Sequence, residues 1–329
     1  MKNANLRVAK RAKKDEFYTC LEDIEAELQH YEDHFVGRTV YLNYDDYRRS
    51  KFWIYFIENA ERLGIKRVIA THYSEWKCPL FDKRMPTYHA EWNSGTITVH
   101  PIDGNGDFRS QYCIELLKHA DIVVTNPPFS LFHEYVAQLI EYNKKFLIIG
   151  NQNAITYKEI FPFIKANRIW LGVHVLQKFT IPSHYPLTSK SYRIEEDGGR
   201  VIKANGVKWF TNLPHNKCNE KLILYHKYSP EKYPHYDNYD AIEVSKVKDI
   251  PEDWTGAMGV PITFMDKYNP DQFEILGIPD RSNSSGLRIK KYTRSDCINY
   301  HDLNVASIIK EDGVLKSTYS RILIRHKQP

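Results

Sequence analysis

The segment Asn126-Pro127-Pro128-Phe129 places an amide, two prolines and an aromatic ring directly after a short apolar run, residues 122–125. Apolar and β-branched residues in an unbroken row predict a strand buried on both faces of a parallel sheet. The prolines have no N–H group to give the sheet, so we expect the strand to end there. Ligands of open α/β sheets bind at the carboxyl ends of the strands, and this segment would stand at such an end.

These groups suit the activation of an exocyclic amino group on a nucleic-acid base. Such a nitrogen is a poor nucleophile because its lone pair is delocalised into the ring. The side-chain oxygen of Asn126 and the carbonyl of Pro127 can each accept one N–H, which favours a tetrahedral nitrogen and localises the lone pair. Phe129 can stack on the base. The alternative is a buried strand that ends in a turn at Asn126, and these four residues alone do not decide between the two.

Composition limits the classes of protein to which the chain can belong. Its 329 residues are enough for two domains, and 42% hydrophobic and 26% charged residues are typical of soluble globular proteins. We find no apolar run long enough to cross a bilayer and no apolar signal segment, so we expect a cytoplasmic protein without a membrane partner. The net charge of +5 is compatible with a polyanionic partner.

Cysteine usage argues against metal and disulfide chemistry. The five cysteines are scattered along the chain without a close pair: Cys20, Cys78, Cys113, Cys218 and Cys297. We therefore expect no metal site and a reducing compartment.

The segment Asn126–Phe129 must be positioned by strands that alternate with helices. Apolar runs predict strands at residues 38–43, 66–71, 97–102, 122–125 and 145–150, and helical spacing predicts helices from about residue 50, at 112–119 and at 132–142. This alternation predicts a doubly wound, mostly parallel α/β sheet. Further strands expected at 169–172, 207–211 and 222–225 lack long helices between them and suit an antiparallel edge.

A helix is also expected before the first strand. Leu21, Ile24, Leu28 and Tyr31 recur at the spacing of one helical face. Thr19 is a plausible N-cap for this helix, with Glu22 completing a capping box. That role competes with any ligand role of Thr19.

Basic residues gather at two places. Residues 2–14 contain six basic residues and no acid, which fits a frayed terminus or an arm that contacts phosphates. After Tyr228 the chain becomes rich in tyrosine and proline, and we expect a domain boundary there: an arm at 1–14, a catalytic domain at 15–228 and a recognition region at 229–329. Within that region, the flexible loop 281–286 stands beside Arg288, Lys290, Lys291 and Arg294, which suits either a phosphate contact or an ordinary solvated loop.

Several stretches together resemble a known family. The matching stretches are Asp15-Glu-Phe-Tyr-Thr19 with Asp23-Ile-Glu25, Asn43-Tyr-Asp-Asp46, Gly106-Asp-Phe-Arg-Ser110, residues 120–132, Gly150-Asn-Gln-Asn153 and Gly206-Val-Lys-Trp-Phe-Thr-Asn-Leu213. They cover residues 15–215 approximately and resemble the EcoRI-like adenine-specific DNA methyltransferases, which depend on S-adenosylmethionine. The resemblance implies a Rossmann-like methyltransferase fold with a smaller C-terminal recognition region.

The resemblance also implies a role for each matching residue. It assigns catalysis to Asn126, Pro127, Pro128 and Phe129. It assigns cofactor binding to Tyr18, Thr19, Asn43, Asp45, Asp46, Asp107 and Phe108, the last two near the adenine of the cofactor. DNA contacts are expected from Lys10, Arg11, Lys13, Lys14, Arg288, Lys290 and Lys291. The chain departs from wider methyltransferase patterns in lacking a glycine-rich loop after residue 43 and an acid at the end of the strand at 66–71, where Glu75 is the nearest candidate.

The predicted function is methyl transfer to N6 of an adenine that is flipped out of double-stranded DNA at a specific site. We expect a role in restriction–modification or DNA protection, with functional pairing to a restriction endonuclease without a stable complex. Two alternatives stay open from the residues. One is methylation of cytosine N4, an RNA adenine or a protein glutamine, and the other is a non-catalytic DNA-binding protein with a degenerate cofactor site.

Overall fold

The protein folds into two compact units, described here from a computed structural model. The structure describes residues 18–74, 77–78, 83–84, 87–102, 104–181, 192–195, 198–280, 286–296 and 303–327. The first unit comprises residues 1–152 and 171–215, and the second comprises 153–170 and 216–329. The functional division expected near residue 228 remains a prediction, and the basic arm lies outside the described residues.

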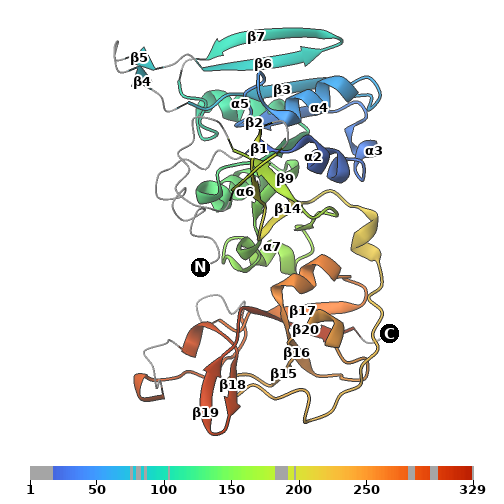
Figure 1. Cartoon of the computed structure of the whole chain (residues 1–329), viewed down its shortest axis with the longest axis vertical. Coiled ribbons are helices and arrows are strands. Elements are labelled where there is room, and N and C mark those ends of the chain that lie inside the picture. The colour runs from blue at the N-terminus through green and yellow to red at the C-terminus, as the bar shows by residue number, and fades with distance from the viewer. Residues whose placement is uncertain are drawn as a thin grey trace. The chain divides into compact units, whose positions relative to one another are not determined.

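An eight-stranded sheet forms the centre of the first unit (Figure 1). Its strand order is β10-β14-β9-β8-β2-β3-β6-β7. The bounds are β2 (Thr39–Asn43), β3 (Arg67–Thr71), β6 (Thr87–Asn93), β7 (Thr96–Ile102), β8 (Ile122–Thr125), β9 (Lys145–Asn151), β10 (Trp170–Leu171) and β14 (Val207–Thr211). Strands β9, β8, β2 and β3 run parallel to one another, so the segment Asn126–Phe129 follows a central strand as expected.

The sheet is mixed, which corrects the expectation of a mostly parallel sheet. Strand β14 pairs antiparallel with β9 at one side, and β6 and β7 pair antiparallel beyond β3 at the other. The sequence pattern identified β7 but missed β6, its hairpin partner. The two strands are joined by Ser94 and Gly95, both with positive φ (48° and 83°), as tight hairpin turns require.

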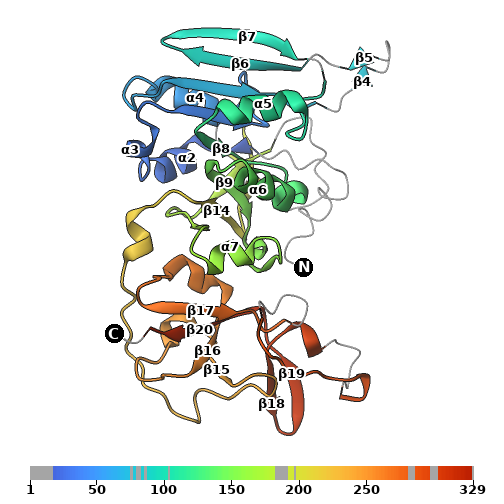
Figure 2. The ribbon, with the colours of Figure 1, turned by 180° about the vertical axis from the view of Figure 1, so that it is seen from behind.

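Helices cover both faces of the central sheet (Figures 1 and 2). Successive side chains of a strand point to opposite faces, and Leu42 of β2 packs in one core with residues of the helices before and after that strand. On the other face, the ring of Phe132 lies 5.0 Å from that of Phe210 in β14. The helices of this unit are α2 (Leu21–Leu28), α3 (Glu32–Phe35), α4 (Lys51–Asn59), α5 (Gln111–His119) and α6 (Phe132–Glu141), with the 3-10 helix η1 (Phe129–Leu131). The 3-10 helix η2 (Gln152–Thr156) begins at Gln152 and otherwise belongs to the second unit.

Thr19 is not the N-cap of α2, which is another correction. Cys20 occupies the cap position and makes no side-chain cap bond, while Thr19 belongs to the short strand β1 (Tyr18–Thr19). Strand β1 pairs antiparallel with β11 (Lys178–Thr180), so a partner distant in sequence overrides the local capping signal. The small sheet has the order β1-β11-β13-β12, with β12 at Tyr192–Ile194 and β13 at Arg200–Lys203.

The second unit contains a four-stranded sheet of order β15-β16-β20-β17. Its strands are β15 (Ala241–Glu243), β16 (Ala257–Pro261), β17 (Phe273–Gly277) and β20 (Arg321–His326), and a hairpin is formed by β18 (Ile308–Glu311) and β19 (Val314–Ser317). Helix α7 (Phe161–Lys165) joins this sheet, because the Nζ of Lys165 donates to the carbonyl of Leu276 at 2.7 Å.

The strand expected at 222–225 is absent from the described structure. The side chain of Gln272 instead holds this extended segment, accepting from the N–H of Leu222 at 2.8 Å and donating to its carbonyl at 2.7 Å. The remaining short elements are β4 (Lys77–Cys78), β5 (Lys83–Arg84), η3 (Asn216–Asn219), η4 (Val247–Asp249), η5 (Ile262–Lys267), η6 (Arg294–Asp296) and η7 (Leu303–Val305).

Candidate active site

Asn126 and Thr19, which are far apart in sequence, come together at the carboxyl end of β8. Asn126 follows the last residue of the strand, and its Nδ2 lies 3.4 Å from Thr19 Oγ1. Thr19 is buried, and its place is set by the pairing of β1 with β11. Pro127 is buried, and Phe129 is partly buried against the main core. The two most informative sequence motifs therefore meet in one place.

Asp45 connects β8 to the loop after β2. Its Oδ2 accepts from the Thr125 hydroxyl at 2.9 Å, and its Oδ1 accepts from the Ser50 hydroxyl at 2.6 Å. Thr125 also donates to the carbonyl of Asn43, and Ser50 caps α4 by accepting from the N–H of Trp53 at 3.2 Å. Although residue 45 is partly exposed, burial of its carboxyl raises the pKa to about 7, against the opposing effect of the hydrogen bonds from Ser50 and Thr125.

The other two acids at this edge are already paired with arginines. Asp46 accepts from Arg48 Nε at 2.9 Å and Nη2 at 2.8 Å, and Asp107 accepts from the same two atoms of Arg109 at 2.9 and 2.8 Å. Burial works against ionisation of both acids, but the arginines outweigh it and hold each pKa below its usual range. Among the described residues, no cationic side chain pairs with Asp45.

Asn43 joins the ends of β2 and β3. Its Nδ2 donates to the hydroxyls of Tyr41 at 2.6 Å and Thr71 at 3.2 Å. Its Oδ1 is buried and has no hydrogen-bond partner within the described part of the chain. Because buried polar atoms are normally satisfied, this oxygen fits a site that receives a polar ligand.

The loop before α5 lies tightly against the segment that follows β3. Gly106 has a φ of +73°, and a Cβ added there would lie 2.1 Å from the carbonyl oxygen of His72. Only glycine permits this close approach of the two backbone segments. Phe108 is 2% exposed and packs edge-on against Tyr135 at 5.1 Å. Its expected stacking on the cofactor remains a prediction.

Two buried carboxylates on α2 were given no role from the sequence, although Asp23 stands in one of the matching stretches. Glu27 accepts from the N–H of Val173 at 3.0 Å, and Asp23 accepts from the N–H of Gln177 at 3.0 Å and from His174 Nε2 at 2.7 Å. Burial raises the pKa of Glu27 despite its hydrogen bonds. These acids hold segment 173–178, which leads into β11 and so supports β1. Their spacing of four residues, on the face that also carries Ile24 and Leu28, is the signal that could have revealed them.

The structure describes only some of the residues that are expected to contact DNA. Arg288, Lys290 and Lys291 are exposed in the second unit, where Lys290 forms an ion pair with Asp237 at 2.6 Å. Lys10, Arg11, Lys13, Lys14 and Glu75 lie outside the described residues. In the described ranges, no three side chains gather to hold a metal ion, and no helix is long and apolar enough to cross a membrane.

Comparisons with known proteins give one consistent answer. The family model described as adenine-specific methyltransferase EcoRI matches residues 5–327. The Type II methyltransferase M.EcoRI of Escherichia coli is 50% identical over 289 residues, which cover 83% of this chain and 89% of that protein. The Type II methyltransferase M.MpnI of Mycoplasma pneumoniae is 38% identical over 328 residues, covering 97% of each chain. M.MgeORF184P of Mycoplasma genitalium, also a Type II methyltransferase, is 39% identical over 331 residues, covering 97% of this chain and 98% of that one. The chain therefore belongs to the EcoRI family of adenine-specific methyltransferases, and it is an adenine-specific DNA methyltransferase.

Proposed function

We propose that this enzyme transfers a methyl group from S-adenosylmethionine to N6 of an adenine flipped out of its specific site in duplex DNA. Asn126 and the carbonyl of Pro127 are the acceptors for the amino group in this proposal. The observation that carries it is the 3.4 Å contact between Asn126 and Thr19 at the carboxyl end of a central strand. The mixed sheet with helices on both faces would then be a Rossmann-like cofactor-binding domain.

The residues at this edge of the sheet fit the cofactor. S-adenosylmethionine, when bound, supplies a methyl group on a positively charged sulfonium and also carries an ammonium group. Of the three acids at this edge, Asp45 is the one without a cationic partner among the described residues. The Oδ1 of Asn43 is a buried acceptor that receives no hydrogen bond from the described part of the chain. Together with these two, Tyr18, Thr19, Asp46, Asp107 and Phe108 are the residues we propose to hold the cofactor.

The proposed catalytic step needs orientation rather than a protein nucleophile. Asn126 and Pro127 accept the two N–H groups of adenine, which localises the lone pair on N6 in line with the methyl group. Alignment of this kind supplies a large part of a rate enhancement. When S-adenosylmethionine is bound, N6 would take its methyl carbon as the bond from that carbon to sulfur breaks, which would leave the sulfur as a neutral thioether. The positively charged N6 would then lose one proton to solvent. The thiols of Cys20 and Cys113 need take no part, because burial raises their pKa and keeps them protonated.

Binding of the DNA must offset the cost of removing the adenine from the helix, which is a few kcal/mol. We assign this task to the second unit and to the basic arm of residues 2–14, with Phe129 stacking on the flipped base. In the cell, methylation at specific sites would protect DNA from a restriction endonuclease that acts on the same sequence, without a stable complex between the two enzymes.

The test is a product analysis with purified protein. Duplex DNA of mixed sequence is incubated with S-adenosylmethionine, digested to nucleosides and analysed by mass spectrometry, and sequencing that detects modified bases locates the methylated sites. We expect N6-methyladenine at one short sequence, and none with Asn126→Ala. N4-methylcytosine in its place, or methylation confined to RNA or to protein glutamine, would reject the proposal.

A further inference from the structure

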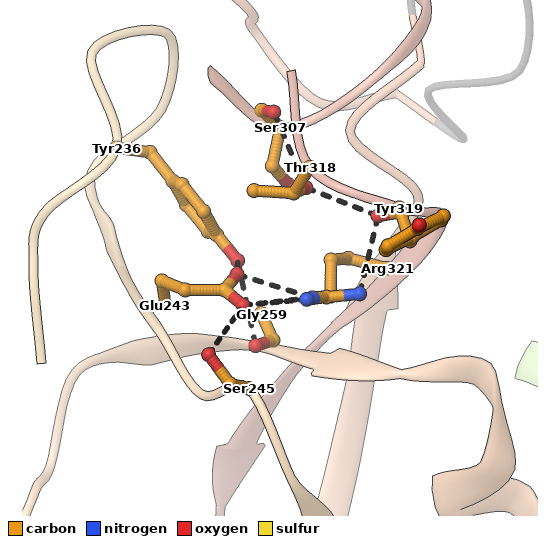
Figure 3. A network of polar contacts seen from close by, with 8 residues as sticks. All are labelled: Tyr236, Glu243, Ser245, Gly259, Ser307, Thr318, Tyr319 and Arg321. Atoms are coloured by element: carbon orange, nitrogen blue, oxygen red, sulfur yellow. Dashed lines mark hydrogen bonds and ion pairs between the residues drawn. The ribbon is translucent and has the colours of Figure 1, made fainter. Parts of the chain in front are cut away.

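A buried ion pair lies at the centre of a polar network in the second unit (Figure 3). Glu243 in β15 is 5% exposed and Arg321 in β20 is 8% exposed. Arg321 Nη2 lies 2.6 Å from Glu243 Oε1, and its Nε lies 3.1 Å from both carboxylate oxygens. The hydroxyl of Tyr236 donates to the same carboxylate.

The network extends to a turn at the surface. The remaining nitrogen of the guanidinium group, Nη1 of Arg321, donates to the carbonyl of Tyr319 at 3.3 Å. The hydroxyl of Thr318 donates to the same carbonyl at 3.0 Å, and the N–H of Thr318 donates to the carbonyl of Ser307 at 2.9 Å. The backbone on both sides of the Tyr319 side chain is therefore held, as Figure 3 shows.

The ring that this turn carries projects into solvent. Tyr319 is 89% exposed, the highest value among the exposed large hydrophobic side chains in the described part of the chain. A single exposed aromatic residue needs no special explanation. A buried ion pair, however, gains little net stability because both charges lose their hydration. A buried network that adds little stability but fixes the backbone of one exposed aromatic residue indicates that the protein needs this ring to point in one direction.

The turn is connected to the basic stretch that follows residue 286. The side chain of Asn238 accepts from the N–H of Ile308 at 3.0 Å and donates to the carbonyl of Ala306 at 2.8 Å. The main-chain carbonyl of Asn238 accepts from the N–H of Lys290 at 3.0 Å. The segment at 306–308 in turn holds Thr318. Arg288 and Lys291, on either side of Lys290, are exposed and form no ion pair with any described residue. Two available positive charges and an exposed ring are thus attached to one framework.

We propose that Tyr319 is a DNA-contacting residue of this methyltransferase, and that Arg321 and Thr318 are positioning residues for it. The ring packs against a base or a deoxyribose, while Arg288 and Lys291 contact phosphates. Aromatic packing against nucleic acid needs the face of the ring and not its hydroxyl, whereas phosphate contacts need charge. This inference rests on the proposed role of the second unit in DNA binding.

The test measures binding of the full-length enzyme to a duplex that contains its methylation site, across a series of salt concentrations. We expect Tyr319→Ala to weaken binding by about 5- to 150-fold, the range for loss of one aromatic–base contact of 1–3 kcal/mol. Tyr319→Phe should bind within about twofold of wild type, because the ring is kept. The salt dependence should be unchanged in both, whereas Arg288→Ala should lower the slope by about 0.9. Tyr225→Ala is the matched control, since that tyrosine is 77% exposed in the same unit.

The positioning role is tested with Thr318→Val, which removes one donor to the Tyr319 carbonyl and leaves the ion pair intact. We expect a smaller loss of affinity than for Tyr319→Ala, and no further loss when the two substitutions are combined. Wild-type affinity in Tyr319→Ala, or an equal loss in Tyr225→Ala, would overturn the assignment of Tyr319. Additive losses in the double variant would overturn the positioning role. A wild-type enzyme that neither binds nor methylates the duplex would instead reject the proposed function itself.

Discussion

The pKa of Asp45, about 7, predicts that cofactor affinity depends on pH below neutrality. If only the ionised carboxylate binds the positively charged cofactor, the apparent Kd is the intrinsic Kd divided by the ionised fraction. That fraction is about one half at pH 7, one eleventh at pH 6 and one hundredth at pH 5. The Kd should therefore rise about fivefold from pH 7 to pH 6 and about ninefold from pH 6 to pH 5.

Equilibrium binding of S-adenosylmethionine at these three pH values measures the effect. The range is chosen because an α-amino group, with a pKa of about 7.7–8.0, stays largely protonated throughout it. Asp45→Asn should bind weakly at pH 7 and change little at lower pH. Asp46→Asn is the control: Arg48 holds the pKa of Asp46 below its usual range, so Asp46 does not titrate here. The variant should keep a pH-dependent Kd, displaced to lower pH because the charge of Asp46 helps to raise the pKa of Asp45.

Stability gives an independent measurement of the same group. The folded protein holds a proton on Asp45 that the unfolded chain releases at lower pH, so the contribution of this residue to stability falls as pH rises from about 4 to 7. The shift of the pKa to about 7 corresponds to at most about 4 kcal/mol, and partial exposure reduces it. Asp45→Asn without cofactor should gain stability over wild type at pH 7.5 and not at pH 4. A Kd that is flat across pH, or a slope that persists in Asp45→Asn, would refute the assignment.

Three further predictions follow from the site and the arm. Asn126→Ala should abolish methyl transfer and leave the Kd for S-adenosylmethionine nearly unchanged, which turnover and binding assays separate; near-normal turnover would remove Asn126 from the mechanism. Gly106→Ala should destabilise the protein and weaken cofactor binding, because its Cβ would meet the His72 carbonyl at 2.1 Å, whereas Gly95→Ala has a similar φ of +83° with nothing within 4 Å and should cost only the backbone strain of about 1–3 kcal/mol. Deletion of residues 2–14 should weaken DNA binding at low salt and lower the salt slope by about 0.9 for each lost phosphate contact, with site preference kept; an unchanged slope would make the arm a frayed terminus only.

Strands and helices that depend on apolar repeats were predictable from the sequence. Strands β2, β3, β8, β9 and β14 follow buried runs, and Ser50 and Ser110 cap α4 and α5 next to such runs. Strand β6 (Thr87–Asn93) was not predicted because its polar and aromatic residues form no apolar run, although most of them are buried in the structure. Its partner β7 is an exposed edge. Thr19 was assigned to a cap because the capping pattern is local, while its actual partner strand starts at residue 178.

The location of the candidate site was predictable, but its electrostatics were not. The carboxyl end of β8 and the loops after β2 and before α5 were expected to carry it, and the structure brings these segments together. Nothing in the sequence indicated that Arg48 pairs with Asp46 and Arg109 with Asp107. The members of each pair are two residues apart, and their side chains can meet only if the backbone turns between them. That pairing leaves Asp45 as the acid whose charge can respond to a ligand.

The position of Thr19 beside Asn126 depends on residues that touch neither of them. Asp23 and Glu27 on α2 bind backbone N–H groups of segment 173–178, which continues into β11, and β11 pairs with β1. A Cβ at Gly172 would lie 2.2 Å from Glu27 Oε1 and 2.6 Å from the Cβ of Trp209, so the close packing at residue 172 requires glycine. Each link is a hydrogen bond from a buried or partly buried group, and the loss of one leaves its partner unsatisfied at a cost of about 1–3 kcal/mol. Substitutions of Asp23 or Glu27 should therefore displace the backbone that places Thr19 beside the amide of Asn126. Their effect on turnover should exceed what their distance from Asn126 suggests.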